Sequence, residues 1–494
     1  MNNLVLRIFA SGVMPAILFL NQAVAPMTVQ PHHTISINAG GLDSLLDPIF
    51  AQQMARLHIP GAVIAIVKDG KVLFTKGYGY ADIEKKTPAV PNKTIFRIGS
   101  ITKVFTATAV MQLADRGKIS LKDDVNRYLK AFQVPATYHQ PITFANLLTH
   151  TSGLDEITPG RRTSDRSKVI PLAEFLKTRM VRILPPGQII SYSTYNAAPG
   201  GLLVEQITGT PFKVYLRQNI FEPLGLNHTS IADVTPEYKQ DLATGYEYDG
   251  KNHQKLPFQW FNTYPASDIN STASDMARFM IANLAGGALD GKRILSQRAM
   301  AEMQATHFRN HPRVPGWAYG YYEGYQNGRR YVEHGGSMDD GYSALLTMFP
   351  KEKFGLFVAC NTETGGFGLG EALKQALINH YFPVSEKPAA SNKVTNQTPA
   401  SLQRFAGKYR GYIYCHTCPP NSGAYFPDPV EVKVNDDGTL SFQEGRWRQV
   451  EALLFELASG PRAGQRLLAF REGPDSTIAF MFQEAFRTYE RVSQ

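Results

Sequence analysis

The chain has 494 residues, of which 43% are hydrophobic and 19% are charged, and its formal net charge is +9. This is the composition of a globular protein, and the length is enough for two or three domains. The excess positive charge lies in short pairs such as Arg161-Arg162 and Arg329-Arg330, which we interpret as solvated surface, without a nucleic-acid-binding motif. We therefore expect a basic soluble protein, or one with anionic substrates, and no nucleic-acid partner.

Residues 1–25 have the pattern of an export signal. A short N-terminal segment that ends in the positively charged Arg7 precedes the apolar stretch Ile8–Leu20. Residues Ala23–Ala25 then supply the small side chains that a cleavage site requires. The stretch is too short to span a bilayer comfortably. The sequence predicts an exported protein, periplasmic or secreted, with no stable membrane span after cleavage. Because Pro26 directly follows the proposed cut, an uncleaved N-terminal anchor is the alternative.

The next elements are a helix, a hairpin and a second helix. Helical spacing covers Leu42–Ile59, and Gly61–Asp82 predicts two strands joined by a tight turn at Asp69-Gly70. A segment apolar on nearly every side follows Ser100, which predicts a helix packed inside the protein and ending near Gly117.

Strand character returns late in this part of the chain. Residues 120–330 are mixed, with helical patterns, Gly and Pro, whereas Glu333–Asn361 predicts strands and Gly366–Phe382 predicts a closing helix. The pattern indicates an α/β (α+β) fold, in which distant segments complete one antiparallel sheet beside a helical lobe.

The C-terminal part predicts a separate small all-β domain. Ser385–Ala400 is polar and lacks periodicity, as linkers do, and the residues after it carry strand candidates with a hairpin turn at Asp437-Gly438. We expect a main domain over residues 26–384, a linker over 385–400, and a barrel-like or sandwich-like accessory domain over 401–494.

The three cysteines do not form a complete zinc site. Cys360 lies in a strand-like run and is interpreted as a buried thiol. Cys415 and Cys418 lack the second half of a zinc knuckle, so either a local disulfide or a pair of ordinary thiols is expected. No metal and no other cofactor is predicted.

Ser100 and Lys103 stand one helical turn apart, so their side chains can meet on one face of the helix. A lysine shielded from water there has a lowered pKa, and its neutral amine can take a proton from the serine. This arrangement fits nucleophilic catalysis.

Two further motifs follow in the order of a known superfamily. Tyr192-Ser193-Thr194 precedes a helical run, and His334-Gly335-Gly336 opens the late strands. With the Ser-x-x-Lys motif at Ser100, they resemble the three motifs of the serine β-lactamase and penicillin-binding protein superfamily. The chain is most similar there to class C β-lactamase-like esterases, D-peptidases and related carboxypeptidases, and the resemblance covers roughly residues 42–382.

The resemblance implies a role for each motif residue. Ser100 would be the nucleophile that forms an acyl-enzyme, and Lys103 would keep the serine and tyrosine protons mobile. Tyr192 would act as a general base, which requires positive charge to lower its pKa. His334 would face the catalytic groups and the leaving group.

The resemblance also implies the substrate-binding groups. Gly335 and Gly336 would let a substrate backbone lie against the strand. The backbone N–H groups of Ser100 and Ser337 would form the oxyanion hole. Two other polar residues, His150 and Asp275, are interpreted as structural.

Thr194 departs from the family pattern, which commonly has asparagine at this place. The asparagine normally bridges the lysine and the amide of an acylamino substrate. Its absence puts β-lactam and peptide turnover in doubt but leaves acyl-enzyme chemistry intact.

The predicted function is an exported serine hydrolase that acts on an ester or amide of a small molecule, or on a short or cell-wall-related peptide. The alternative within the class is a true β-lactamase or D-alanyl-D-alanine carboxypeptidase. An alternative of another class is a non-catalytic protein that binds peptidoglycan or a partner. The sequence does not determine the substrate or the oligomeric state.

Overall fold

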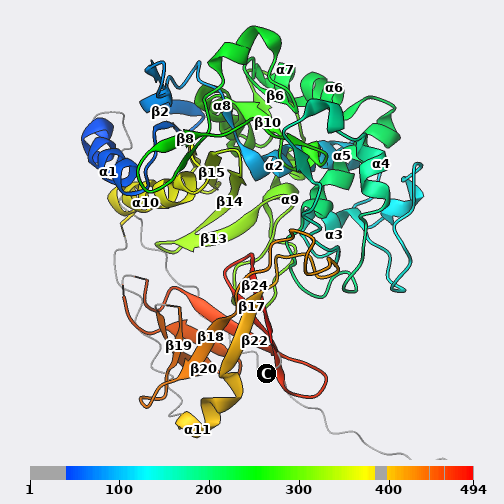
Figure 1. Ribbon diagram of the computed structural model, residues 1–494, viewed down its shortest axis with the longest axis vertical. Coiled ribbons are helices and arrows are strands. Elements are labelled where there is room, and N and C mark those ends of the chain that lie inside the picture. Colours follow the sequence, from blue (N-terminus) through cyan, green and yellow to red (C-terminus); the bar gives the residue numbers. More distant parts are fainter. Residues whose placement is uncertain (1–40, 384–397, 444, 461, 493–494) are drawn as a thin grey trace, which may run out of the picture. The chain divides into compact units, whose positions relative to one another are not determined.

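The main sheet combines strands from two distant parts of the sequence. The computed structural model describes residues 41–383, 398–443, 445–460 and 462–492. All neighbouring strands of the seven-stranded sheet are antiparallel, in the order β13 (Tyr322–Gln326), β14 (Arg329–Met338), β15 (Tyr342–Phe349), β16 (Phe354–Cys360), β1 (Gly61–Lys68), β2 (Lys71–Asp82) and β3 (Thr87–Pro88) (Figure 1). The pairing of β1 with β16 confirms that distant segments complete one sheet.

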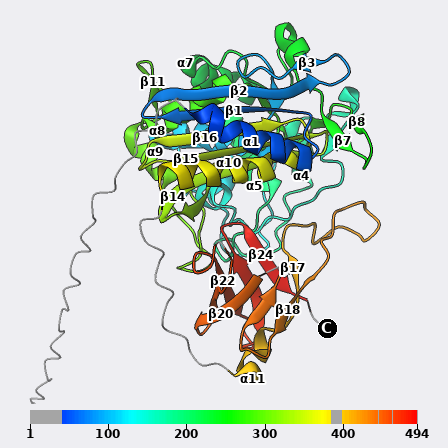
Figure 2. The ribbon, with the colours of Figure 1, turned by 90° about the vertical axis from the view of Figure 1, so that its left-hand side faces the viewer.

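Helices cover both faces of this sheet. On one face lie α1 (Leu42–Arg56) and α10 (Gly365–Tyr381), which Figure 2 shows in front of the strands, on the side of the sheet that faces the viewer. The strand β1 is buried on both sides: Ala62, Ile64 and Ile66 pack towards these two helices, and Val63, Ala65 and Val67 join the larger core on the opposite side. The predicted helices and the hairpin at Asp69-Gly70 are confirmed.

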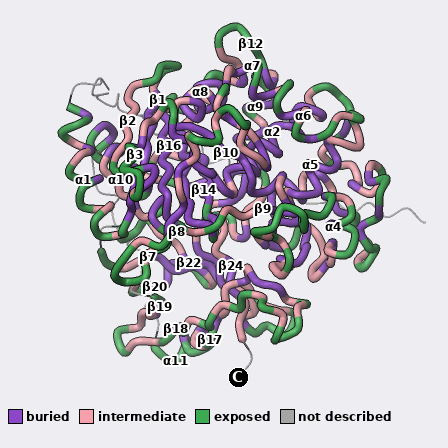
Figure 3. Tube along the Cα trace, turned by 45° about the horizontal axis from the view of Figure 1, so that its top comes forward, coloured by how far each residue is buried: buried purple, intermediate pink, exposed green. Residues whose placement is uncertain are grey.

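A helical lobe lies on the other face. Its central helix, α2 (Thr102–Asp115), is buried over almost its whole length, as its apolar sequence predicts, and Figure 3 shows buried stretches concentrated in the sheet and this helix. The other helices are α3 (Phe144–Leu148), α4 (Leu172–Lys177), α5 (Thr194–Thr208), α6 (Phe212–Leu216), α7 (Glu222–Leu224), α8 (Ala273–Leu284) and α9 (Gln297–Gln304).

Short strands pair in the loops between the main elements. They are β4 (Phe96–Arg97), β10 (Ile269–Ser271) and β6 (Ser230–Ile231) in one sheet, and the pairs β5 (Arg162–Thr163) with β9 (Trp260–Phe261), β7 (Tyr246–Tyr248) with β8 (His253–Lys255), and β11 (Ala288–Leu289) with β12 (Lys292–Arg293). The α/β architecture with a helical lobe is as predicted.

The C-terminal part is a closed barrel, which decides between the predicted barrel and sandwich. Its strands are β17 (Gly407–Gly411), β18 (Val430–Val434), β19 (Leu440–Phe442), β20 (Gly445–Glu451), β21 (Leu454–Leu457), β22 (Leu467–Glu472), β23 (Ile478–Gln483) and β24 (Arg487–Arg491), preceded by α11 (Pro399–Leu402). The barrel has its own apolar core around Phe405, Trp447 and Phe470. Asp437 and Gly438 lie between β18 and β19, at the predicted hairpin turn.

Apolar clusters also join the barrel to the lobe. One of them contains Ile189 and Val314 of the lobe together with Tyr412 and Phe482 of the barrel. Another contains Trp317 and the barrel residue Ala485, with Tyr192 packed against it. Two apolar clusters, separate from the main core and from the barrel core, therefore contain residues of both parts, and the predicted domain boundary stays a prediction.

Several predictions concern segments that the structure does not describe or describes in part. The predicted signal and cleavage site lie outside the described residues, as does the linker except for its last residues, which begin α11. Over the described ranges, no helix is both long and apolar enough to cross a membrane. Cys415 and Cys418 form a disulfide, and Cys360 is a buried thiol.

Candidate active site

Ser100 lies in a short 3-10 helix (Gly99–Ile101) at the start of α2, pressed against β14. Gly99 has a left-handed φ of 53°, and a Cβ there would stand 2.9 Å from the amide nitrogen of Ser337. A Cβ on Gly336 would collide with the carbonyl oxygen of Ile98. Two glycines therefore allow the serine turn and the strand to touch, which brings Ser100 and Ser337 together.

Lys103 is buried and directs its amine at the serine. Its Nζ lies 3.0 Å from Ser100 Oγ and 2.8 Å from the carbonyl oxygen of Ala266. Burial lowers the pKa of Lys103 to about 7; the nearby Glu156 carboxylate opposes this shift and Arg161 adds to it. A substantial fraction of this amine is therefore neutral near pH 7, when it can accept a proton.

Tyr192 lies beside both groups. The Lys103 Nζ stands 5.1 Å from the centre of its ring, and the ring of His150 stacks on it at 4.5 Å. Burial raises the pKa of the Tyr192 phenol, although a hydrogen bond with Ser100 opposes the rise. The expectation that positive charge lowers this pKa is therefore wrong for this structure, because the loss of water outweighs the neighbouring charge.

His334 is a neutral, buried side chain on β14. Its Nδ1 lies 2.7 Å from the carbonyl oxygen of Gly335, which can only accept, so Nδ1 carries the proton. Burial lowers the pKa of His334 to about 3, and the charge of Lys103 acts in the same direction. Its Nε2 has no hydrogen-bond partner among the described residues, which leaves an acceptor near the ring of Tyr192, 6.2 Å away between ring centres.

Gly335 and Gly336, which follow His334, allow other parts of the protein to pack closely against β14. A Cβ on Gly335 would run into the ring of Phe367, and Gly336 is pressed against the serine turn. Close packing within the protein accounts for both glycines, and the expected room for a substrate backbone stays a prediction. Ser337 is exposed, and its hydroxyl donates to the carbonyl oxygen of Glu363 at 3.1 Å.

Thr194 is held by a carboxylate that sequence analysis did not identify. Its hydroxyl donates to Glu156 at 2.8 Å and accepts from Arg161 at 3.1 Å, and its backbone N–H donates to Glu156 at 2.5 Å. Glu156 and Arg161 form an ion pair, so the interpretation of Arg161 as solvated surface is wrong. No spacing rule marks Glu156, because only the folded loop brings it to the second motif.

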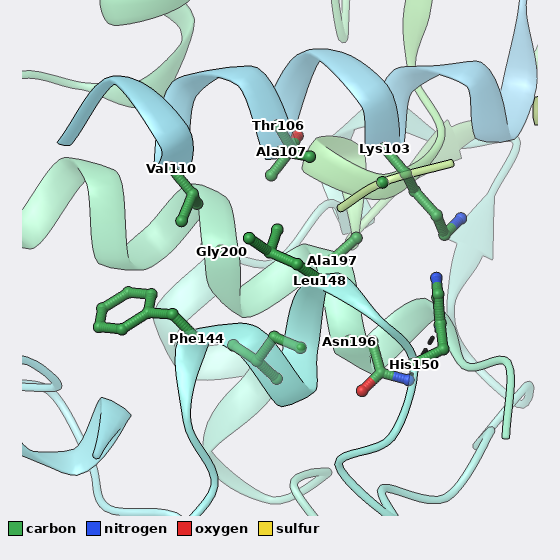
Figure 4. Close-up of a pocket in the computed structure, with 12 residues that line it drawn as sticks. Lys103, Thr106, Ala107, Val110, Phe144, Leu148, His150, Asn196, Ala197 and Gly200 are labelled. Carbon is green, nitrogen blue, oxygen red and sulfur yellow. Dashed lines mark hydrogen bonds between the residues drawn. The ribbon is translucent and has the colours of Figure 1, made fainter. Parts of the chain in front are cut away.

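His150 and Asp275 have the structural surroundings expected of them. His150 Nδ1 accepts from the backbone of Ser193 at 3.2 Å and from the Asn196 amide at 3.0 Å. Figure 4 shows His150, Asn196 and Lys103 around a cavity of about 20 Å³, room for about one water. Asp275 accepts from the backbone of His228 at 2.8 Å near the start of α8.

A second, larger cavity contains the nucleophile. It has a volume of about 870 Å³ and is lined by Ser100, Tyr192, Thr194 and Ser337, with Arg162, which pairs with Asp339, at its wall. Barrel residues complete the wall, among them Tyr412, Tyr414, Tyr425 and Phe486. The cavity is large enough for a drug-sized molecule or a short peptide. Among the described residues, no group of three or more His, Cys, Asp and Glu could hold a metal ion.

The fold is that of the serine β-lactamase and penicillin-binding protein superfamily. The β-lactamase family model matches residues 46–379, and the chain belongs to this family.

Two bacterial proteins are similar to this chain in sequence. Protein flp of Staphylococcus aureus (strain N315) is 30% identical over 347 residues, which cover 68% of this chain and 66% of that protein. The putative penicillin-binding protein PbpX of Bacillus subtilis (strain 168) is 31% identical over 240 residues, covering 48% of this chain and 57% of PbpX. The chain thus spans slightly less than two thirds of flp and a smaller share of PbpX.

Solved structures of similar fold cover nearly the whole chain. The octameric penicillin-binding protein homologue from Pyrococcus abyssi has a TM-score of 0.59 and 22% identity, with 90% of this chain and 99% of that chain covered. SurE has a TM-score of 0.61 and 21% identity, with 91% and 99% covered. These similarities extend over the barrel as well as the β-lactamase-like part.

Proposed function

We propose that this protein is an exported serine hydrolase that forms an acyl-enzyme on Ser100 and hydrolyses an ester or amide. The observation that carries the proposal is the 3.0 Å distance between Lys103 Nζ and Ser100 Oγ, with burial lowering the lysine pKa to about 7. Membership of the β-lactamase family supports the same chemistry. Export rests on the signal pattern of residues 1–25.

Lys103 is the first proton acceptor in this proposal. The neutral amine takes the Ser100 hydroxyl proton while Oγ bonds to the substrate carbonyl carbon, and the N–H groups of Ser100 and Ser337 receive the negative oxygen. The proton then passes to the leaving group as its bond to carbon breaks. Water next attacks the acyl-enzyme and loses a proton to the same amine. The bond between the acyl carbon and Ser100 Oγ then breaks and Oγ takes this proton back from Lys103, which releases the acid and restores the serine and the neutral amine.

Tyr192 serves in this proposal as a neutral relay. Its raised pKa makes phenolate unfavourable, but a phenol can donate to one oxygen while it accepts from another group. It can therefore pass a proton between Ser100, Lys103 and the leaving group without becoming charged. The unpartnered His334 Nε2 offers an acceptor on the same side.

Thr194 favours simple esters over acylamino substrates. Its single hydroxyl proton is already donated to Glu156, so it cannot also serve a substrate amide as asparagine can. The family resemblance implies that the alternatives, a β-lactamase or a D-alanyl peptidase, use that amide contact, so their substrates would lose about one hydrogen bond here. D-aminoacyl esters belong in the substrate panel, because SurE has been solved with D-Leu.

Covalent labelling tests the proposal. The full-length protein is exposed to a fluorophosphonate and to a panel of activated esters, D-aminoacyl esters, penicillins and cephalosporins. Intact mass and peptide mapping locate any adduct. We expect one adduct, on Ser100, that Ser100→Ala abolishes. An adduct on Ser193 or Ser337, or a folded protein that reacts with no reagent, would refute the mechanism and favour a binding protein.

A further inference from the structure

The barrel contacts the segment of the second motif through a buried carboxylate. Asp155 is fully buried in the lobe and has no cationic partner among the described residues. Its carboxylate accepts from the backbone of His416 at 2.9 Å, from the backbone of Thr417 at 3.0 Å and from the Thr417 hydroxyl at 2.6 Å. All three donors come from the turn that the Cys415–Cys418 disulfide closes.

Glu156, which follows Asp155 in the sequence, connects this contact to the active site. The Glu156 carboxylate accepts from the backbone and hydroxyl of Thr194 and from the Ser193 hydroxyl, at 2.5 to 2.9 Å. The Ser193 hydroxyl also contacts the backbone carbonyl of Asp155 at 3.0 Å. Two adjacent carboxylates thus bind in opposite directions, one to the barrel turn and the other to the residues after Tyr192.

The barrel holds the residues before Tyr192 as well. The Thr488 hydroxyl donates to the carbonyl oxygen of Ile190 at 2.7 Å. The Trp317 indole, which packs against His150 and Tyr192, donates to the carbonyl oxygen of Ala485 at 3.0 Å. The tyrosine segment is therefore anchored to the barrel on both sides.

We propose that the disulfide-closed Cys415–Cys418 turn is a positioning element of the active site, which holds Asp155 and through it the segment that carries Tyr192. Asp155 does not line the large cavity, so it acts on the reaction through the residues it fixes and not on the substrate. The catalytic part of this inference rests on the proposed function. The barrel is then a structural part of the site and more than an accessory domain.

The matched pair Thr417→Val and Thr417→Ser tests this directly in the full-length protein. Thr417 is exposed, so neither change disturbs a core. Valine keeps the shape but cannot donate to Asp155, whereas serine keeps the hydroxyl. We expect valine to slow acylation of Ser100 about fivefold at saturating reagent, with KM unchanged, and serine to keep the rate.

Two further variants enlarge the effect and one controls for it. Asp155→Asn places an amide donor against backbone N–H groups, and we expect it to slow acylation about tenfold or more. Replacing Cys415 and Cys418 together by serine should act in the same direction. The control is Glu451→Gln, which removes an exposed ion pair between Glu451 of the barrel and Arg313 of the lobe, 2.5 Å apart. This pair lies away from the tyrosine segment, so the variant should acylate Ser100 at the normal rate.

Hydrogen exchange separates this inference from the proposed function. The backbone N–H groups of residues 191, 193 and 194 are bound in the structure, and we expect residues 190–196 to exchange faster in Thr417→Val and Asp155→Asn but not in Thr417→Ser or Glu451→Gln. This readout needs no activity, so it decides the inference even if Ser100 is never acylated. Unchanged exchange in folded Thr417→Val and Asp155→Asn would overturn the inference.

Discussion

The two segments that meet in the active site are held in different ways. The serine turn and Lys103 belong to one helix start, and the hydrogen bonds of Lys103 go to Ser100 and Ala266 in the β-lactamase-like part. Arg97, just before this turn, is buried between Asp268 and Asp340. The segment of Tyr192 is irregular and depends on contacts with loops and with the barrel. The serine and its lysine are therefore held within the β-lactamase-like part, whereas the tyrosine segment also depends on the barrel.

The largest expected effect is the loss of the lysine. Lys103→Met keeps the apolar stem but removes the amine, and we expect kcat/KM to fall about a thousandfold, as for other general bases. Steady-state kinetics on an activated ester measures this, with Ser100→Ala as the baseline. A decrease smaller than about tenfold would mean that Tyr192 is the main base, which would contradict the assignment of Lys103 as the general base.

The next effect concerns the contact between the serine turn and β14. Gly336→Ala places a methyl group against the carbonyl oxygen of Ile98, and we expect the oxyanion donors to separate and kcat to fall about a hundredfold. The control is Gly368→Ala, whose methyl group meets the flexible side chain of Leu57. Normal kcat in a folded Gly336→Ala protein would contradict the role of this contact.

The pH dependence of kcat/KM tests whether Lys103 is the general base. Because the neutral amine is the active form, kcat/KM should rise with pH through about 7 and then level off, falling about tenfold per pH unit below that value. Burial lowers the Lys103 pKa from its ordinary 10.5 to about 7, so the unfolded chain binds more protons between these values. The free energy of unfolding should therefore rise with pH across this window, and Lys103→Met should lack that component.

A smaller effect is expected at the tyrosine segment. Thr194→Asn supplies an amide that can donate to an acylamino substrate, so kcat/KM for penicillins or D-alanyl peptides should rise about two- to twelvefold relative to simple esters. The ratio of the two rate constants in variant and wild type measures it. Equal changes for both substrate classes would show that Thr194 does not set the preference.

The smallest effect is expected from chelators. A serine mechanism with a lysine base needs no metal, so EDTA should leave kcat and KM unchanged within error. Recovery of a lost activity by added zinc would instead assign the chemistry to a metal and contradict the proposed role of both segments.

The sequence alone determined what depends on short-range spacing. Ser100 and Lys103 meet because residues three apart share a helix face, and α1, the β1–β2 hairpin and α10 form where periodicity and turn residues predict them. The family followed from the order of three motifs. The all-β character of the C-terminal part also could be predicted, because its strands and turns are local patterns, whereas the structure decided for a closed barrel over a sandwich.

Only the tertiary structure decided the protonation and support of the site. Burial, which sets the pKa of Lys103 near neutrality and raises that of Tyr192, depends on packing around each group. Glu156 reaches Thr194 across 38 residues, and the Cys415–Cys418 turn reaches Asp155 across about 260. No local pattern marks such partners, since long-range hydrogen bonds form only when the folded backbone brings their atoms together.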